Sequence, residues 1–262
     1  MGISASSGII SGINFDEIVK QLIALERRPK DLLQNRQKDY ELKIGAFDET
    51  TIKLSSLKTA TKSLDFTDKD TATKTIKDFV KSYNEVMKFL GDQLSYDPNI
   101  NKKNPLLGDN TLLQIGKKIG DIVTGTKTSG RYVNLSQIGI ATDAGTGKLT
   151  LDETKLKNAL DTDLAAVEKV FTDRSGKLIA TIDAYTDSGK GIIKTKEDSL
   201  RKSVDNLISQ QNRIEDNLTL KEKTMRGQFA RLESLLGNLN AQNQYITAQL
   251  TKLGTISSGD KK

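Results

Sequence analysis

The feature that most constrains the fold of this chain is a long helical repeat near its C-terminal end. The segment from Thr195 to Leu253 contains no proline, the residue that most strongly breaks helices. Apolar residues recur along it at alternating steps of four and three, which is the heptad spacing of a coiled coil. An unbroken helix over this segment would be about 88 Å long at ~1.5 Å per residue, so it requires helical partners.

Two sets of apolar residues make up this repeat. The predicted coiled-coil core consists of Leu200, Val204, Leu207, Ile214, Leu218, Met225, Leu232 and Leu235. Nearer the C-terminal end the repeat continues with Leu239, Ile246, Leu250 and Leu253. Polar side chains interrupt the seam at Gln211, Lys221, Gln228, Gln242 and Gln249. An interrupted seam favours packing within an assembly over a simple, stable zipper.

A shorter amphipathic helix is expected close to the N-terminus. Residues 1–12 carry no charge and no helical period, so we expect them to be disordered in the isolated chain. Asn14 can then cap a helix, with Glu17 completing a capping box. Pro29 is expected to end or kink that helix near Arg28. The apolar face of the helix consists of Phe15, Ile18, Val19, Leu22 and Leu25.

The middle of the chain predicts several helices around one hairpin. A polar break over 65–74 follows a long helical pattern, and residues 96–104 are predicted to form a loop. Two alternating apolar runs around a glycine-rich turn predict a β-hairpin near 135–151. Asp152 and Asp163 can each cap a short helix after the hairpin.

Together these patterns predict a mainly helical protein. We expect a long antiparallel coiled coil or helical bundle formed by the N- and C-terminal segments, with one small β-hairpin region. The stretches 1–44 and 240–262 are expected to form a helical leg region that is disordered in the monomer. Residues 45–239 are expected to form a helical-bundle core domain that carries the hairpin.

Composition excludes several classes of function. The chain has no cysteine and no histidine, so it can form no disulfide, thiolate nucleophile, His-ligated metal site or Ser-His-Asp triad. We therefore expect no enzymatic activity, no cofactor and no metal. Its 40 basic and 34 acidic residues are mixed along the chain rather than gathered into the basic patch of a nucleic-acid binder. No run of about 18 apolar residues predicts membrane insertion, and no secretory signal is visible.

Two motifs that could carry chemistry fail on their spacing. The glycine-rich turn at 145–148 has Thr142 where a phosphate-binding P-loop requires glycine, and Leu149 where it requires Ser or Thr. The acidic residues Asp161 and Asp163 lack the spacing of a calcium-binding loop. We interpret the first motif as a hairpin turn and the second as helix caps.

Several segments resemble one known family, the flagellar filament cap proteins, also called hook-associated protein 2. The similar segments are SGIISGINFDEIVKQLIALERRP, FVKSYNEVMKFL, NPLLGDNTLLQI, LSQIGIATDAGTGKLTLDETKLKNAL and AAVEKVF. The end of the chain, over 191–253, resembles that family's carboxy-terminal coiled coil. These segments follow the family's order along nearly the whole chain.

The resemblance implies a scaffold for flagellum assembly rather than an enzyme. Cap proteins form a closed ring at the growing filament tip, where they retain exported flagellin and promote its folding and polymerisation. The expected partners are copies of this chain in a pentamer, flagellin, the hook–filament junction protein, and an export chaperone on the C-terminal helix. The expected location is extracellular, after export through the flagellar apparatus without a cleaved signal peptide.

The chain departs from the family in one region. Family members carry a large variable region, mostly β, before the FVKSYNEV-like block, whereas here Leu64 and Ile76 are separated by only 11 residues. The variable outer domains are therefore absent between about 64 and 76, either naturally or by removal. Because the family links that region to ring contacts and surface recognition, its absence affects the expected ring size and any role in cell adhesion.

The apolar residues near the two termini are the expected contact sites with the filament. These leg residues are Phe15, Ile18, Val19, Leu22 and Leu25, with Leu239, Ile246, Leu250 and Leu253. A simpler interpretation is that they only join the two ends of the chain. Two other functions stay open, namely a coiled-coil surface adhesin and another axial or junction protein of the flagellum.

Overall fold

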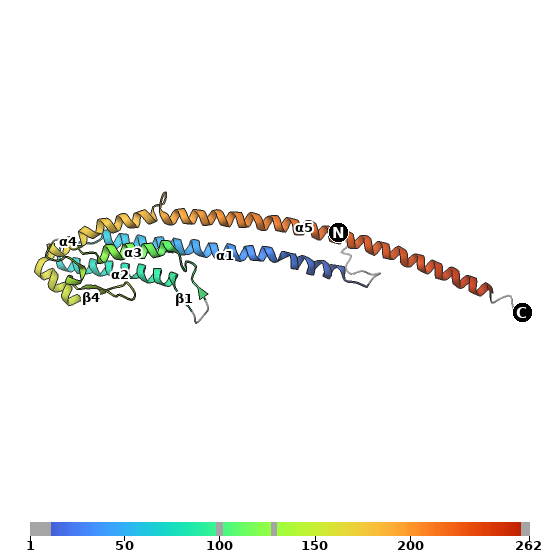
Figure 1. Ribbon diagram of the computed structural model, residues 1–262, viewed down its shortest axis with the longest axis horizontal. Coiled ribbons are helices and arrows are strands. Elements are labelled where there is room, and N and C mark those ends of the chain that lie inside the picture. Colours follow the sequence, from blue (N-terminus) through green and yellow to red (C-terminus); the bar gives the residue numbers. More distant parts are fainter. Residues whose placement is uncertain (1–11, 98–101, 127–129, 258–262) are drawn as a thin grey trace. The chain divides into compact units, whose positions relative to one another are not determined.

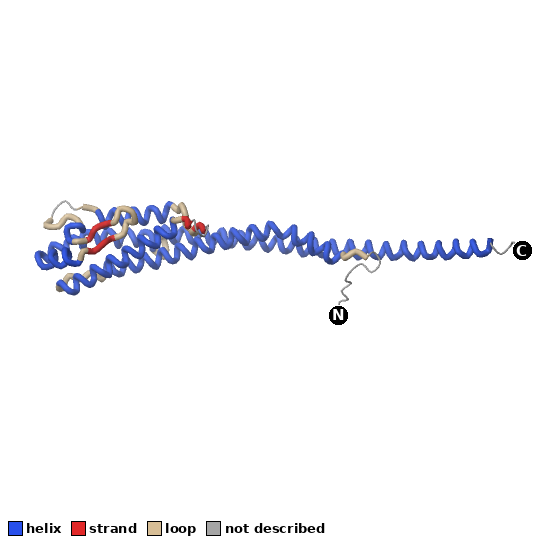
Figure 2. Tube along the Cα trace, turned by 90° about the horizontal axis from the view of Figure 1, so that it is seen from below, coloured by secondary structure: helices blue, strands red, loops and turns tan. Residues whose placement is uncertain are grey.

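The computed structural model describes residues 12–97, 102–126 and 130–257 (Figure 1). Helices dominate these ranges, so the prediction of a mainly helical fold is confirmed (Figure 2). The helices are α1 (Phe15–Lys62), α2 (Lys69–Leu94), α3 (Asn110–Thr124), α4 (Glu153–Thr186) and α5 (Ile192–Ser257). Segment 1–11, for which we predicted disorder, lies outside the described residues.

The predicted hairpin is confirmed, and a second one accompanies it. Strands β3 (Ile140–Thr142) and β4 (Leu149–Leu151) pair antiparallel, with Ile140 opposite Leu151. The preceding residues Leu135–Ile138 form a 3-10 turn instead of a strand. The segment expected to be a loop contains β1 (Tyr96–Asp97) and β2 (Lys102–Lys103), which also pair antiparallel. Two-residue strands are too short to leave an alternating pattern in the sequence.

The expectation that Pro29 would end the first helix is wrong, because α1 continues to Lys62 with Pro29 inside it. The alternative, a kink near Arg28, stays a prediction. One acidic side chain on α5 holds α1 on both sides of the proline. Glu215 accepts from Arg27 at 3.0 Å and from Lys30 at 2.6 Å. Pro29 itself is exposed. These two ion pairs hold the helix on both sides of the proline, which has no backbone N–H to donate within the helix.

The caps predicted after the hairpin are present, but the two helices they begin form one kinked element, α4. Asp163 has non-helical backbone angles inside α4 (φ −162°, ψ 84°). Its carboxylate accepts from the backbone N–H of Ala166 at 2.9 Å, as an N-cap does. The polar break is also shorter than expected, because Asp68 caps α2 and accepts from the N–H of Thr71 at 2.8 Å.

Contacts divide the chain into two compact units. The terminal unit comprises residues 1–37 and 206–262, and the central unit comprises residues 38–205. These divisions fall at different points from the expected domain limits at 44 and 240. Both α1 and α5 run from one unit into the other. The leg region as we defined it stays a prediction about the assembled protein.

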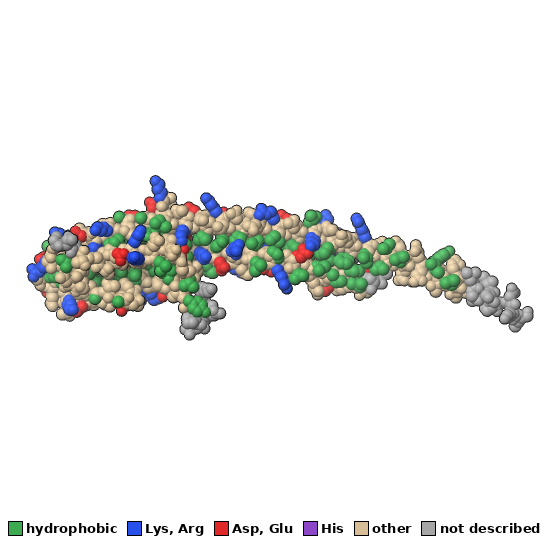
Figure 3. All heavy atoms as spheres, viewed as in Figure 1, with side chains coloured by type: hydrophobic (Ala, Val, Ile, Leu, Met, Phe, Trp, Pro, Cys, Tyr) green, Lys and Arg blue, Asp and Glu red, His purple; other side chains and the backbone are tan. Residues whose placement is uncertain are grey.

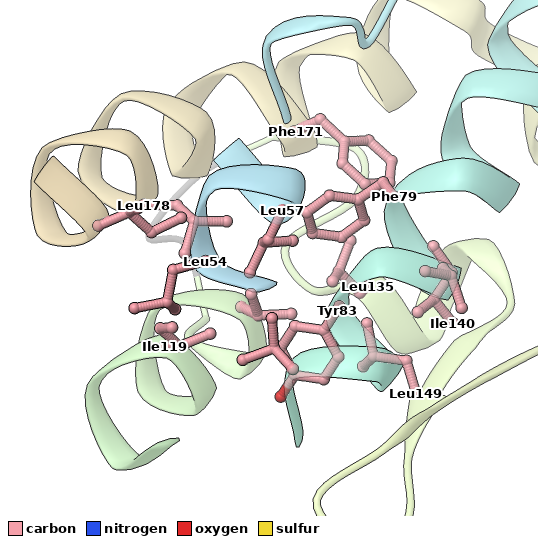
Figure 4. Packing of buried hydrophobic residues seen from close by; sticks show 14 of the residues in the cluster. Leu54, Leu57, Phe79, Tyr83, Ile119, Leu135, Ile140, Leu149, Phe171 and Leu178 are labelled. Carbon is pink, nitrogen blue, oxygen red and sulfur yellow. The ribbon is translucent and has the colours of Figure 1, made fainter. Parts of the chain in front are cut away.

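The core of the central unit lies where α2, α3, α4 and the middle of α1 meet. Figure 4 shows Leu54 and Leu57 of α1, Phe79 and Tyr83 of α2, Ile119 of α3 and Phe171 and Leu178 of α4 packed together with Leu135, Ile140 and Leu149. Each labelled side chain is at most 5% exposed. Burial raises the pKa of the Tyr83 hydroxyl to about 12. Charges of both signs are spread over the face of the molecule in Figure 3, as the mixed sequence predicts.

The hairpin is fixed to the core by two polar side chains of α2. Asn84 makes two hydrogen bonds with the backbone of Leu149, one as donor and one as acceptor, each 2.7 Å long. Tyr83 donates to the carbonyl oxygen of Gly147 at 3.1 Å. A side-chain amide can replace a neighbouring strand in this way because it carries the same donor and acceptor as a peptide group. Two segments of the family resemblance, FVKSYNEVMKFL and the hairpin block, therefore contact each other directly.

Candidate interaction surface

The terminal unit consists of one antiparallel helix pair. Its core is small, with Val19, Ile23 and Leu218 buried. Partly buried side chains extend the core along α5, and they are Ile214, Met225 and Phe229. The rings of Phe15 and Phe229 stack with their centroids 4.7 Å apart. The predicted antiparallel pairing of the two terminal segments is confirmed by these contacts.

Polar contacts set the register of this pair. Asp16 pairs with Arg226 and Glu26 pairs with Lys221, and Glu215 bridges two basic residues as described above. The hydrogen bond from Lys30 is the main cause that lowers the pKa of the Glu215 carboxyl. Such surface ion pairs add little stability individually, because solvent screens them. Residue numbers rise along α1 as they fall along α5, so the contacts select one antiparallel register.

The N-terminal leg residues do not share one face of α1. Phe15 and Val19 point toward α5, together with Ile23. Three others remain in contact with solvent, with exposed fractions of 38% for Ile18, 42% for Leu22 and 53% for Leu25. Adjacent helical positions differ by about 100° around the axis. The five residues therefore form two neighbouring stripes, of which one is buried by α5.

We call the exposed stripe of α1 the α1 outer stripe. It consists of Ile18, Leu22, Leu25, Pro29 and Leu32. Leu32 is 71% exposed, the highest value in the stripe among its large aliphatic residues. The spacing of four, three, four and three is itself a heptad pattern. The α1 helix thus carries a second coiled-coil seam beside the one that α5 covers.

The predicted coiled-coil core of α5 is covered only in part. Leu207 and Leu218 are buried, while Ile214 and Met225 are half-buried in the terminal unit. Within the central unit, the half-buried residues Leu200 and Val204 precede them on the same helix. Two further residues are exposed, Leu232 by 46% and Leu235 by 59%. The pairing with α1 therefore ends before these two leucines.

The C-terminal leg residues continue this exposed stretch of α5. Leu239, Ile246 and Leu250 are 52%, 56% and 63% exposed, and the side chain of Leu253 lies outside the described residues. Figure 3 shows apolar side chains gathered on the surface of the terminal unit. We call the set Leu232, Leu235, Leu239, Gln242 and Ile246, with Leu250 beside it, the α5 outer stripe. Residues 234–251 contain no charged side chain.

Sequence reasoning missed three residues that organise these surfaces. Ile23 and Phe229 are packed in the helix pair, and Asn84 holds the hairpin. The spacing of Phe15, Val19 and Ile23 at steps of four contained the signal for the buried face. No comparable pattern marks Asn84, because its partner lies 65 residues away.

The described residues offer little for chemistry. They include no cluster of three or more acidic residues that could hold a metal ion, and none of their helices is both long and apolar enough to cross a membrane. A hollow of about 380 Å³ in the central unit is lined by Phe47, Leu106 and Lys196 among others. Lys196 lies over the Phe47 ring and donates to Asp109 at 2.6 Å. We assign this hollow a structural role, because Lys196, one of the two lysines that line it, already has a carboxylate partner.

A long helix pair that leaves two apolar stripes exposed is typical of coiled-coil proteins that work in assemblies. The family described as "Flagellar hook-associated protein 2 C-terminus" matches residues 19–241. The chain therefore belongs to this family.

Individual relatives agree with this assignment. Flagellar hook-associated protein 2 of Escherichia coli K12 is 31% identical over 186 residues, covering 66% of this chain and 40% of the relative. The B-type protein of Pseudomonas aeruginosa is 28% identical, covering 71% and 40%. The protein of Thermotoga maritima is 26% identical, covering 78% and 38%. The chain spans about 40% of the length of these curated relatives.

One solved structure is also similar in part. It is the crystal structure of the D1-D2-D3 domains of the flagellar cap protein from Escherichia coli. The match has a TM-score of 0.45 and 31% sequence identity, and it covers 50% of this chain and 37% of the other.

Proposed function

We propose that this chain is a filament-capping scaffold at the tip of the bacterial flagellum, which retains exported flagellin and promotes its folding and polymerisation. The observation that carries the proposal is the family match over 19–241. That match includes both the central bundle and most of the paired terminal helices. It also includes the hairpin that Asn84 fixes to α2. The chain shares about 40% of its relatives' length, and the proposed capping function is assigned to that shared part.

The contact with the filament would use the two outer stripes. Full burial of a leucine or isoleucine side chain stabilises by about 1.5–3 kcal/mol, and each exposed member of a stripe provides part of that on docking. Several such partial contacts add up to binding, yet each is weak enough to be released singly. That property suits a cap which must move each time a flagellin subunit is added.

The remaining parts of the proposal concern location and partners. The protein would leave the cell through the flagellar export apparatus and act outside it, as a closed ring of copies. Flagellin is the partner beneath the ring, the junction protein is a neighbour early in growth, and a chaperone would cover the apolar end of α5 before export. The uncharged stretch 234–251 fits a segment that is covered in each of these states.

Complementation tests the proposed function. A motile strain that lacks its own cap would express this chain together with its cognate flagellin. We expect long filaments on the cells and little flagellin monomer in the medium. Leaked flagellin despite export of this chain would contradict the cap function. Motile cells that release this chain as free protein would favour the adhesin.

A double variant tests the surfaces. Leu22→Asp with Ile246→Asp places a charge in each outer stripe, so we expect loss of tip retention and a rise in secreted flagellin. The matched control is Ile52→Asp with Leu113→Asp, two residues of the central unit that are 62% and 51% exposed. The control should cap normally. Normal capping by the first variant would contradict a contact through the stripes.

A further inference from the structure

The two outer stripes of the terminal unit have matching spacings. From Ile18 to Leu32, the α1 outer stripe advances in steps of four, three, four and three. From Leu232 to Ile246, the α5 outer stripe advances in steps of three, four, three and four. The order of steps in the α5 outer stripe is therefore the reverse of the order in the α1 outer stripe. Two helices with this relation can interlock their side chains in an antiparallel coiled coil.

The α5 outer stripe cannot reach the α1 outer stripe of its own chain. Phe229 already lies opposite Phe15, so the part of α5 after it extends past the described start of α1. The helix is unbroken to Ser257 and offers no turn on which it could fold back. A pairing between an α5 outer stripe and an α1 outer stripe therefore joins two molecules.

We propose that the α5 outer stripe of one copy of this protein packs antiparallel against the α1 outer stripe of a second copy. The five layers are Leu32 with Leu232, Pro29 with Leu235, Leu25 with Leu239, Leu22 with Gln242, and Ile18 with Ile246. Each layer joins an a position to a d position, as antiparallel coiled coils require. Four of the five layers are entirely apolar.

The opposite orientation fits less well. A parallel pairing aligns Ile18 with Leu235 and continues to Leu32 with Gln249, which leaves only three apolar layers. It also places both Leu25 and Leu32 against glutamines, whose amides would lose hydrogen bonds to water on burial. Since residues 234–251 carry no charge, they meet no like charge beside Arg28 or Asp31 in either orientation. The apolar layers therefore decide in favour of the antiparallel pairing.

This contact joins two different surfaces, so it is heterologous. After one pairing each copy still offers one free stripe, and further copies can add to form either a ring or an open assembly. The pairing spans about four helical turns on each side, which makes it a small and concentration-dependent interface. It goes beyond the cap function, in which the same stripes meet the filament, and it concerns the protein before it docks.

Cysteine crosslinking tests the pairing directly, because the native chain has no cysteine. The variant Leu25→Cys/Leu239→Cys places two thiols in one proposed layer. On oxidation of the purified full chain we expect disulfide-linked dimers, trimers and larger species on a non-reducing gel. A reducing agent should return them to monomer. The ladder follows from the heterologous contact, since every copy carries both thiols.

Two matched variants serve as controls. One tests the orientation of the two helices, and the other measures crosslinking through random collision. Leu25→Cys/Gln242→Cys reports the parallel alignment. Leu42→Cys/Leu239→Cys keeps the α5 thiol but moves the other to an exposed site of the central unit, where Leu42 is 59% exposed. We expect at least tenfold less crosslinking in both. Equal crosslinking in all three variants, a preference for the Gln242 variant, or no crosslinking in any would each overturn the proposal.

A charge swap provides a second test that needs no oxidation. Leu25→Glu and Leu239→Lys should each lower the average mass seen by sedimentation equilibrium, because each places one unpaired charge in a layer. The double variant should recover much of the mass, because the two charges would then face each other. Circular dichroism must show the same helix content in all variants. Single variants with unchanged mass would also overturn the pairing.

Discussion

Gly139 occupies a position that only glycine fits. It ends the 3-10 turn before β3 with a φ of 89°, in the left-handed region. A side chain there would place its Cβ 2.7 Å from the carbonyl oxygen of Asp152 and 2.9 Å from the Cβ of Lys155. The turn, the hairpin and the start of α4 are thus packed around the missing side chain.

We expect Gly139→Ala to destabilise the central unit by about 2 kcal/mol or more, because it adds backbone strain to a steric clash. Urea denaturation measures the change. Gly176→Ala is a matched control inside α4, where a Cβ would meet no atom within 4 Å. That variant should instead gain up to about 1 kcal/mol from helix propensity. Similar losses of stability in both variants would contradict a specific requirement for glycine at position 139.

Glu197 is an acidic residue in an unfavourable place. It lies on α5 with 7% of its surface exposed. Burial is the main cause that raises the pKa of its carboxyl, and the Asp48 carboxylate of α1 raises it further. Arg201 and Lys194 act in the opposite direction without cancelling the shift. A group with a raised folded-state pKa supports the fold when protonated, and that support is lost as the pH rises through the folded-state pKa.

Glu197→Gln should therefore be more stable than the wild type near neutral pH, because the amide stays neutral at every pH. The difference in unfolding free energy should shrink as the pH falls toward the ordinary glutamate pKa of about 4.3. Denaturant titrations at several pH values measure this difference. Asp48→Asn should make this difference in unfolding free energy smaller, because it removes the neighbouring negative charge. A difference that does not vary with pH would show that the ionisation of Glu197 is unimportant.

At the scale of elements, α1 and α5 are aligned by a partly buried amide pair as well as by apolar contacts. Gln211 is 8% exposed and donates to the side-chain oxygen of Gln37 at 2.8 Å. The sequence presents Gln211 only as an interruption of the heptads. In the structure it has a specific partner, and such polar pairs fix the register of coiled coils at some cost in stability.

We expect Gln211→Leu alone to destabilise the terminal unit by about 1 kcal/mol, because it removes the hydrogen bond to Gln37. The double variant Gln37→Leu/Gln211→Leu should recover that loss, since both amides are replaced by apolar groups. A double-mutant cycle monitored by hydrogen exchange in α1 gives the coupling. Additive effects of the two changes would contradict the pairing.

Elements that depend on contacts within a few residues could be predicted from the sequence, whereas elements that depend on distant contacts could not. The predicted caps at Asp152 and Asp163 act within three residues of themselves, so the sequence contains both partners. The passage of α1 through Pro29 depends on Glu215, which lies far along the chain. A sequence pattern cannot show such a contact, and the prediction of a break was wrong for that reason.

The exposed and buried stripes of α1 illustrate the same limit for the candidate site. The exposed stripe has heptad spacing, the buried one advances in steps of four, and the two lie one residue apart, as Ile18 and Val19 do. Periodicity identifies each stripe as apolar but cannot say which one α5 covers. The choice follows from the three-dimensional register, which the stacking of Phe15 on Phe229 and the ion pairs set. Their role as contact residues stays a prediction, and their division between the inside and the surface could not be predicted from the sequence.

At the scale of the whole molecule, the two units differ in what holds them together. The central unit has a continuous core drawn from all five helices and the β3–β4 hairpin. The terminal unit has four buried apolar residues, Val19, Ile23, Leu207 and Leu218, supplemented by surface ion pairs. Apolar burial is the main favourable term in folding, and the stability of local opening follows the number of buried apolar contacts. Although α1 and α5 run through both units, their segments in the terminal unit should open more easily than their segments in the central unit.

Hydrogen exchange of the full chain can resolve this difference. Amides near Val19 and Leu218 should exchange at least tenfold faster than amides near Tyr83 and Ile119, which belong to the central core. Leu218→Ala should remove about 2 kcal/mol or more from the terminal unit, and it should speed exchange there while leaving the central unit unchanged. Equal protection in both units, or a response to Leu218→Ala that spreads through the central core, would mean that the chain opens as one cooperative body. Independent opening is what a protein needs if its terminal helices are to exchange partners while its central bundle stays folded.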